Sequence, residues 1–377
     1  MKVVLAQDWI TDNGGGEACL RGFLDLYPKS PILTTIWNEK KVTQFNDTDI
    51  HTSFLNHYPY AKTKWRLFAP FMPRAVESLR VPLCDVLISN CYAVIKGLII
   101  KPDTLHICYC HTPTRSLWLS EIDERPYEGN FIKRSIASKM AHDLRLWDFL
   151  AAKRPDIFVA NSQNAKKRIK KFYRRDAAVI YPPVNIKKFR IAPANKIGDY
   201  FLFVSRLIPY KKADLVVSAF NKLGLPLKIA GDGPEKRKLA AMAKKNVEIL
   251  GYVDEKKLVS LLSHCRAFIF PAEEDFGIAP VEAMASGRPV IAYRKGGVLE
   301  TVVEGSTGIF FNKQTTGSLI GALKKFEKFE FSFDPCIARK QARKFSLKRY
   351  KKEWQVFIKK SLLDYRESDK INLNNIE

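Results

Sequence analysis

Residues 266–293, RAFIFPAEEDFGIAPVEAMASGRPVIAY, decide the fold class of this chain. The runs 266–270 (RAFIF) and 289–293 (PVIAY) are apolar on both faces, which is typical of buried parallel strands. An acidic loop and a short helical stretch, which begins at Gly277 and ends at Gly287, lie between them. This arrangement predicts a strand–helix–strand unit in a parallel sheet that helices cover.

The same alternation continues along the whole chain. The expected strands share an uninterrupted apolar pattern and lie at 2–7, 31–37, 84–89, 104–110, 156–161, 199–205, 226–230, 247–250, 266–270 and 289–293. The expected helices lie between them, for example at 131–153, 213–223, 235–245, 255–264 and 278–286. The pattern restarts after Tyr181-Pro182-Pro183, where two prolines end regular strand pairing. We therefore expect an α/β protein of two doubly wound, Rossmann-like parallel sheets, with a ligand held in a cleft between the domains.

The length of 377 residues fits two domains, at roughly 150 residues per domain. We place the boundary near residue 183, which gives domains at 1–183 and 184–345. A strongly basic helical pattern covers 339–366, and the C-terminal segment 346–377 is expected to hold a helix and a tail.

The charge of the chain is unusual. It carries 63 Lys and Arg against 39 Asp and Glu, a formal net charge of +24, which implies an anionic partner. Nucleic acid, an anionic membrane face and a phosphorylated substrate all fit that charge. We find no nucleic-acid-binding motif and therefore expect no nucleic-acid partner. The N-terminus reads as a buried strand, no apolar run is long enough to span a membrane, and none of the seven cysteines forms a Cys-x-x-Cys pair. We expect a cytoplasmic protein with reduced thiols and no metal site.

Two loops in the predicted sheets have glycines or cations suited to phosphate. Gly14-Gly15-Gly16 follows the first strand and precedes a helix, so it fits either a phosphate contact or a plain tight turn. The loop from Ser205 to Lys212 follows the first strand of the second domain. Arg206 and Lys211 in that loop can clamp a diphosphate, although a solvated basic turn is the alternative.

Two further loops follow strands of the second domain. Gly231-Asp232-Gly233 permits close backbone approach, which a simple strand-to-helix turn explains equally well. Glu274 lies on the acidic loop and Glu282 within the helix after it, with seven residues between them. Carboxylates suit the hydroxyls of a sugar or ribose, and the helix N-terminus suits a phosphate. A solvated acidic loop is the alternative.

Taken in order, these motifs resemble glycosyltransferase family 4, whose members are retaining nucleotide-sugar transferases of GT-B architecture. The resemblance covers nearly the whole chain, and its most specific parts are Arg206-Leu207 with Lys211 and the segment from Glu274 to Glu282. Tyr109-Cys110-His111-Thr112-Pro113 and Ile180-Tyr181-Pro182-Pro183-Val184 add to it and make the chain look closest to bacterial mannosyltransferases that build O-antigen, capsule or exopolysaccharide.

The resemblance implies a role for each matching residue. Glu274 would hold donor-sugar hydroxyls, Glu282 the ribose, and Arg206 with Lys211 the diphosphate. His111 would lie near the donor sugar, although a lone histidine at a strand end is also common as a structural residue. The remaining implied donor contacts are Gly15, Gly16, Ser205, Gly231, Gly277, Ile278 and Ala279. The chain departs from the family pattern in having three glycines at 14–16 and Lys212 where the family commonly has glycine.

The resemblance also implies the reaction and its setting. GDP-mannose is the expected donor, with another UDP- or GDP-sugar as the alternative, and the two cations would make the reaction metal-independent without any cofactor. The first domain would take the acceptor, the second the donor, and the C-terminal helix would pack back on the first domain.

A basic and aromatic stretch at 61–80 predicts contact with an anionic membrane surface. Its chief residues are Lys64, Trp65, Arg66, Phe68 and Phe71. We expect a lipid-linked glycan acceptor and a peripheral position at the inner face of a bacterial cytoplasmic membrane. Solvated helix faces and a non-catalytic basic protein of the same fold remain the alternatives.

Overall fold

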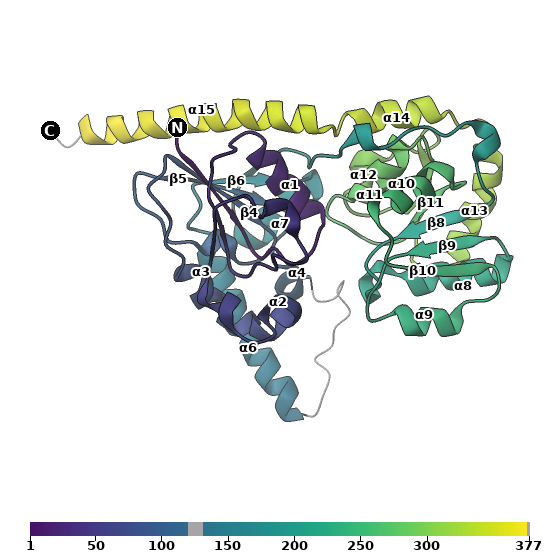
Figure 1. The fold of residues 1–377 in the computed structure, drawn as a ribbon, viewed down its shortest axis with the longest axis horizontal. Helices are drawn as coiled ribbons and strands as arrows, with labels where there is room; N and C mark the ends of the chain where they lie inside the picture. Colours follow the sequence, from purple (N-terminus) through teal and green to yellow (C-terminus); the bar gives the residue numbers. More distant parts are fainter. Residues whose placement is uncertain (120–130, 375–377) are drawn as a thin grey trace. The chain divides into compact units, whose positions relative to one another are not determined.

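The computed structural model describes residues 1–119 and 131–374, which form two compact units (Figure 1). Unit 1 comprises the described residues up to Pro183 together with those from Lys348 onward, and unit 2 comprises Val184–Leu347. Among the described residues, no helix is both long enough and apolar enough to cross a membrane.

Unit 1 is built on a seven-stranded sheet in the order β3-β2-β1-β4-β5-β6-β7, with every pairing parallel. Its strands are β1 (Val3–Gln7), β2 (Ile32–Thr34), β3 (Ile50–Thr52), β4 (Val86–Cys91), β5 (Leu105–Cys110), β6 (Ile157–Ala160) and β7 (Ala177–Val179). The central strands β1, β4 and β5 are buried along their whole length because helices cover both faces of the sheet. The strand order reverses between β1 and β4, and ligands of doubly wound sheets bind at the carboxyl ends of such strands.

The α-helices of unit 1 are α1 (Gly15–Leu24), α2 (Ala61–Lys64), α3 (Met72–Glu77), α4 (Arg115–Trp118), α6 (Phe131–Ala151), α7 (Gln163–Tyr173) and α15 (Leu347–Asn374). Although α15 is last in sequence, it belongs to the first core (yellow in Figure 1). Trp354 is fully buried, and its ring centroid lies 4.8 Å from that of Phe23 in α1 and 5.1 Å from that of Tyr109 in β5. Large aromatic side chains buried in this way hold the helix to the sheet.

Unit 2 repeats the architecture with six parallel strands in the order β10-β9-β8-β11-β12-β13. Its strands are β8 (Phe201–Val204), β9 (Leu227–Ala230), β10 (Val247–Gly251), β11 (Phe268–Phe270), β12 (Val290–Tyr293) and β13 (Gly308–Phe311). Its α-helices are α8 (Ala213–Leu223), α9 (Lys236–Met242), α10 (Glu255–His264), α11 (Ile278–Ala285), α12 (Val298–Thr301), α13 (Thr316–Glu330) and α14 (Pro335–Arg343). The order reverses here between β8 and β11, which places the loops after those two strands at the ligand-binding edge.

The predicted α/β class with two doubly wound parallel sheets is confirmed. The sequence did not reveal β3, β7 and β13, which lie at sheet edges and have only three or four residues, too few for a recognisable apolar run.

The single helix expected at 339–366 is wrong in one respect, because the chain leaves the helix between Arg343 and Leu347. There the carbonyl of Phe345 accepts the backbone N–H of Val184 at 2.8 Å, and Ser346 forms a parallel bridge with Val184. A helical backbone at 345–346 could not make this pairing, so the hydrogen bonds with the first residue of unit 2 explain the break.

Candidate functional site

The candidate site of unit 2 lies at the carboxyl ends of β8 and β11, on either side of the strand-order reversal. The loop from Ser205 to Lys212 follows β8, and the loop 271–277 follows β11 and ends at the start of α11. Because neighbouring parallel strands bring the loops after them to one edge, the two predicted groups of charged residues meet there.

Lys211 and Glu274 form an ion pair between the ammonium Nζ and the carboxylate Oε1. Both side chains are largely shielded, at 16% and 18% exposed. Burial opposes the charged form of Lys211, but the adjacent Glu274 carboxylate outweighs it and raises the pKa of Lys211. The structure thus joins the two residues that the sequence assigned to different parts of a donor.

Arg206 lies on the same loop as Lys211 and is exposed. Its positive charge acts on Lys211 and partly offsets the effect of Glu274 on the pKa. No carboxylate in the described ranges lies within ion-pair distance of Arg206, so its guanidinium is available to an anion. A shielded lysine and an exposed arginine on one loop are suited to a diphosphate. The lysine ammonium can bind a phosphate oxygen as a point charge, and the planar arginine guanidinium can donate two parallel hydrogen bonds to phosphate oxygens.

Glycine geometry shapes the edge around these charges. Gly231 has a φ of +138°, and a Cβ on it would lie 1.8 Å from the carbonyl oxygen of Ser205. Gly231 therefore has a structural reason to be glycine, namely the close approach of the loops after β8 and β9. Gly277, with a φ of +86°, caps α11, where the backbone N–H groups of Ile278 and Ala279 have no acceptor within the helix.

Glu282 lies one turn into α11, and its side chain is partly buried. Burial raises the pKa of this carboxyl to about 7, Lys188 acts to lower it, and Glu255 acts to raise it. Lys188 is itself engaged with Glu255. The carboxyl of Glu282 is therefore in a different electrostatic setting from Glu274, which has a direct cationic partner.

The sequence interpretation missed the loop after β12 that supports Glu274. The backbone N–H of Gly297 donates to the carbonyl of Glu274 at 2.9 Å, and a Cβ on Gly297 would lie 2.1 Å from the carbonyl oxygen of Asp275. Gly296 has a φ of +84° and pairs with Glu274, and the Nζ of Lys295 lies 3.1 Å from Oε2 of Glu273. The signal was the Lys295-Gly296-Gly297 sequence, which begins one residue after the predicted strand 289–293.

In unit 1 the glycine turn lies where α1 begins, with Gly14 as the N-cap and Gly15 and Gly16 in the first turn. The buried carboxyl of Glu17 reaches back to this turn and accepts a backbone hydrogen bond from Gly14, as in a capping box. Burial raises the pKa of Glu17 to about 7. The sequence interpretation gave Glu17 no role, yet its carboxyl already satisfies part of the helix N-terminus.

His111 follows β5 and both of its ring nitrogens have partners. Nε2 lies 2.7 Å from Oδ1 of Asn90, and Nδ1 lies 3.3 Å from Nδ2 of Asn161. Burial lowers the pKa of His111 to about 4, so the ring is neutral at neutral pH. Neither asparagine was singled out as a partner of His111 from the sequence.

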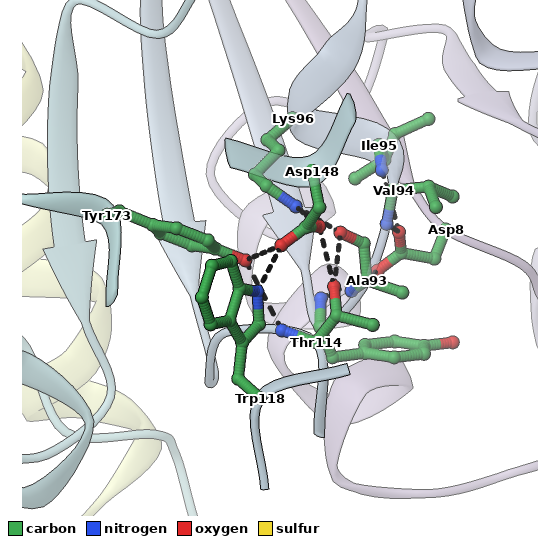
Figure 2. Close-up of polar contacts among 10 residues, drawn as sticks. Asp8, Ala93, Val94, Ile95, Lys96, Thr114, Trp118, Asp148 and Tyr173 are labelled. Atoms are coloured by element: carbon green, nitrogen blue, oxygen red, sulfur yellow. Dashed lines mark hydrogen bonds and ion pairs between the residues drawn. The ribbon is translucent and has the colours of Figure 1, made fainter. Parts of the chain in front are cut away.

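The segment after His111 is held by a buried polar cluster (Figure 2). Asp148 of α6 pairs with Lys96 at 2.6 Å, and both side chains are 1% exposed. The carboxylate of Asp148 also accepts hydrogen bonds from Thr114 at 2.8 Å, Trp118 at 2.7 Å and Tyr173 at 2.7 Å. Because the buried charge has a full set of donors, the cluster fixes the chain that follows His111 without an unpaired ion.

The five residues predicted for a membrane surface do not all point outward. Lys64, Arg66 and Phe71 are exposed, whereas Trp65 stacks on Trp9 at 3.8 Å between ring centroids and, like Phe68, packs on a buried cluster. Trp65 and Phe68 share a face because residues three apart do so in the 3-10 helix at Trp65–Phe71, whereas Phe71, at the end of that helix, is 56% exposed. Leu67, at 69% exposed, is the apolar side chain that projects instead.

The described part of the chain contains no group of three or more His, Cys, Asp or Glu side chains that could hold a metal ion. The cysteines at 19, 91, 108, 110 and 265 are buried and unpaired. They pack as small apolar residues in the cores of the two units.

Comparison with known proteins agrees with this geometry. An uncharacterized glycosyltransferase of Methanocaldococcus jannaschii, MJ1178, is 30% identical over 171 residues, which cover 44% of this chain and 47% of that protein. The alpha-1,3/1,6-mannosyltransferase ALG2 of Dictyostelium discoideum is 36% identical over 115 residues, which cover 28% of this chain and 26% of that protein. The chain thus matches less than half the length of each of these curated relatives.

The likeness in fold extends over both units. The crystal structure of Anabaena HepE in complex with UDP-glucose matches with a TM-score of 0.68 and 16% identity, and covers 96% of this chain and 100% of that one. The architecture is therefore the GT-B fold, as the sequence predicted. Residues 184–348, which contain Arg206, Lys211, Glu274 and Glu282, match the family model described as glycosyl transferases group 1. Unit 2 is thus similar to glycosyl transferases group 1 over its whole length.

Proposed function

We propose that the protein is a retaining glycosyltransferase that moves a sugar from a nucleotide diphosphate donor to an acceptor hydroxyl. The observation that carries this proposal is the shielded Lys211–Glu274 pair beside exposed Arg206 at the strand-order reversal of unit 2. Such an edge offers cations to a leaving diphosphate and a carboxylate to sugar hydroxyls. The family match over 184–348 supports the same reaction class.

The reaction breaks the bond between sugar C1 and the diphosphate oxygen. As negative charge develops on that oxygen, Lys211 and Arg206 neutralise it, and the backbone N–H groups of Gly277, Ile278 and Ala279 add donors. The acceptor oxygen forms the new bond to C1 on the face that the leaving group occupied. The leaving phosphate oxygen takes the acceptor proton, so the products are a nucleoside diphosphate and a glycoside of unchanged anomeric configuration.

Other residues would bind parts of the donor that do not react. Glu274 would bind sugar hydroxyls once the diphosphate engages Lys211, and Glu282 would accept the hydroxyls of the ribose. Ser205 and Gly231 would line the same edge, Gly15 and Gly16 would approach the diphosphate from unit 1, and His111 would lie near the sugar. In this proposal residues 1–183 take the acceptor, residues 184–345 the donor, and the C-terminal helix completes the first domain.

For the donor we propose GDP-mannose. The ALG2 relative is described as a mannosyltransferase, which supports mannose. The HepE structure holds UDP-glucose, so a UDP-sugar is the second candidate.

A thermal-shift panel of nucleotides and nucleotide sugars tests the proposal. Ligand at about 100 times its Kd stabilises the folded state by about 2.7 kcal/mol, so the correct nucleotide should raise Tm clearly. We expect GDP and GDP-mannose to give the largest shifts. If UDP and UDP-sugars gave the largest Tm shifts, the donor would be a UDP-sugar instead of GDP-mannose. If no nucleoside diphosphate raised Tm, the proposal would be contradicted.

We further propose that the protein acts without a metal, because Arg206 and Lys211 neutralise the leaving group. Sugar transfer should therefore be the same with and without EDTA. A strict requirement for Mg²⁺ or Mn²⁺ would contradict this part of the proposal.

We propose a lipid-linked glycan as the acceptor and a peripheral position at the inner face of a bacterial cytoplasmic membrane. The support is the net charge of +24 and the exposed set Lys64, Arg66, Leu67 and Phe71 on one segment of unit 1. Cations with exposed apolar side chains suit the surface of an anionic bilayer.

Liposome flotation with anionic and neutral vesicles tests the membrane surface. The protein should float with the anionic vesicles, and the double variant Leu67→Ser with Phe71→Ser should float less. Equal flotation of the wild type and the variant would contradict this assignment, and tight binding to DNA in a gel shift would favour the nucleic-acid alternative.

A further inference from the structure

Four adjacent strands of unit 1 each end in a polar side chain that belongs to one hydrogen-bonded chain. These side chains are Gln7 of β1, Asn90 of β4, His111 after β5 and Asn161 after β6. Asn90 joins Gln7 at 2.6 Å and His111 at 2.7 Å, and His111 joins Asn161 at 3.3 Å. The chain therefore crosses the carboxyl edge of the sheet at the strand-order reversal.

The orientation of Asn90 follows from its backbone partner. The carbonyl oxygen of Gly16 lies 2.8 Å from the amide nitrogen of Asn90, and a carbonyl can only accept. The same nitrogen donates to Oε1 of Gln7, whose own amide nitrogen donates to Glu17 at 2.8 Å and to the carbonyl of Trp9 at 3.3 Å. Both amides are thus fixed by groups outside the His111 ring.

The proton position on His111 follows in turn. Since the amide nitrogen of Asn90 is committed to Gly16 and Gln7, its Oδ1 is what faces the ring, so Nε2 must carry the hydrogen and donate. Nδ1 then accepts from the amide of Asn161, whose Oδ1 accepts the hydroxyl of Ser162 at 3.1 Å. Ser162 also caps α7, which anchors that end of the chain.

We propose that Asn90 is a positioning residue of the transfer reaction, which holds His111 as the neutral Nε2–H tautomer and fixes the carbonyl of Gly16 at the same time. This inference rests on the proposed function, in which His111 lies near the donor sugar and the glycine turn near the diphosphate. One amide group does both, because the amide oxygen of Asn90 accepts from the ring of His111 and its nitrogen donates to the carbonyl of Gly16.

The consequence for His111 is specific. With Nε2–H donated to Asn90 and Nδ1 accepting from Asn161, the ring has no nitrogen left to exchange a proton with a substrate. His111 therefore acts by its place and shape and not as a general acid or base. This agrees with a reaction in which the leaving phosphate takes the acceptor proton.

Two exchanges at Asn90 remove the donor to Gly16 and change the ring of His111 in different ways. Asn90→Leu, of similar size, removes both the oxygen and the nitrogen. Asn90→Asp keeps an acceptor for the ring but loses the donor to Gly16 and places a carboxylate beside the imidazole, which favours the imidazolium. Asn46→Leu, on an exposed residue of the same unit, is the matched control.

The first readout needs no donor. In ¹⁵N-histidine-labelled protein at neutral pH, the ring resonances of His111, assigned among the six histidines by their loss in His111→Gln, should show a neutral Nε2–H tautomer. Asn90→Leu should give a mixture of tautomers and Asn90→Asp a protonated ring, while Asn46→Leu leaves the pattern unchanged. A wild-type ring protonated at Nδ1, or a pattern unaffected by both exchanges in folded protein, would overturn the proposal.

The second readout is the rate of sugar transfer. Loss of a residue that orients a functional group typically costs about 10- to 100-fold, so Asn90→Leu should lower kcat by that factor with a smaller change in KM for the donor. The double variant with His111→Ala should lose less than the product of the two single losses, because the part of the Asn90 effect that acts through the ring is already gone. Additive losses, or normal kcat in Asn90→Leu with altered tautomers, would refute the positioning role. A wild-type protein with the expected tautomer but no transfer from any nucleotide sugar would contradict the proposed function instead.

Discussion

The two sheets present chemically opposite edges at the same topological position. In unit 2 the edge at β8 and β11 carries full charges, with Lys211 paired to Glu274 and Arg206 beside them. In unit 1 a chain of neutral amides and a neutral imidazole crosses the edge at β1, β4, β5 and β6. Asn90 and His111 are central to it, and one end donates to the carboxyl of Glu17. Ionised side chains dominate the edge of unit 2, and hydrogen-bonded neutral side chains dominate the edge of unit 1.

This difference teaches which kind of task each edge suits. Fixed cations stabilise charge that develops on a leaving group, and they do so without reorganisation. A satisfied chain of neutral groups carries no net charge for that purpose, but it holds side chains in one orientation. Substitutions at the charged edge should therefore affect chemistry most, and those at the neutral edge should affect geometry.

The largest effect should come from the charged pair. Lys211→Ala and Glu274→Ala should each lower kcat for sugar transfer by about 100-fold or more, because Lys211 neutralises the leaving diphosphate and Glu274 holds the sugar in place for transfer. Steady-state transfer assays measure this, with circular dichroism to show that the fold survives. Lys222→Ala, an exposed cation of α8, is the matched control for the loss of one positive charge. Near-normal rates in both site variants would refute the assignment of the charged edge.

A substitution in the loop after β12, which holds the backbone of Glu274, should give the next largest effect, and this effect is on stability. Gly297→Ala places a Cβ within 2.1 Å of the carbonyl oxygen of Asp275, so the backbone must move and the free energy of unfolding should fall by about 2–4 kcal/mol. Urea unfolding measures the change.

Gly321→Ala in α13 is the contrasting exchange, since nothing lies within 4 Å of a Cβ there. It should stabilise the protein by up to about 1 kcal/mol. If Gly297→Ala were as well tolerated as Gly321→Ala, the close packing of the two loops would be wrong.

A pH-dependent effect should come from the glycine turn of unit 1. Burial raises the pKa of Glu17 to about 7, above its ordinary value of 4.5, so the folded protein loses stability as the pH rises from about 4.5 through 7. Glu17→Gln removes this cost, so at pH 8 the variant should have a higher Tm than the wild type. The gain in the free energy of unfolding should be at most about 3 kcal/mol. At pH 4 the two proteins should differ little. If the stability advantage of Glu17→Gln over the wild type became smaller with rising pH, the pKa of Glu17 would not be raised by folding.

The smallest effect should be at Lys212. This residue has a φ of +56°, in the left-handed region, where the related family commonly has glycine. Lys212→Gly relieves roughly 1 kcal/mol of strain but gives the unfolded chain more freedom, so stability should change by less than about 1 kcal/mol. Lys222→Gly, in the last turn of α8, should instead destabilise by up to about 1 kcal/mol, because Lys222 has ordinary helical geometry. Equal losses at the two positions would show that the left-handed geometry at Lys212 has no influence.

Much of the charged edge could be predicted from sequence because the pattern needs only neighbouring strands. Arg206, Lys211 and Glu274 each follow a recognisable strand, and parallel strands bring the loops after them to one edge. The neutral edge could not be predicted, because it depends on pairs such as Gln7 and Asn90, which are 83 residues apart and have no distinctive local motif. The inward packing of Trp65 and Phe68 could not be predicted either, because it depends on contacts with residues distant in sequence, such as Trp9.

Calorimetric titration of a nucleoside diphosphate tests the division of labour between the two edges most directly. GDP and UDP are each titrated into the wild type, Lys211→Ala and His111→Ala. We expect the preferred nucleotide to bind about tenfold or more weakly to Lys211→Ala, which lacks a charge on the diphosphate, and unchanged to His111→Ala, since neither nucleotide carries a sugar at the leaving position. Unchanged affinity in Lys211→Ala, or an equal loss in His111→Ala, would contradict the assignment of the diphosphate to the charged edge.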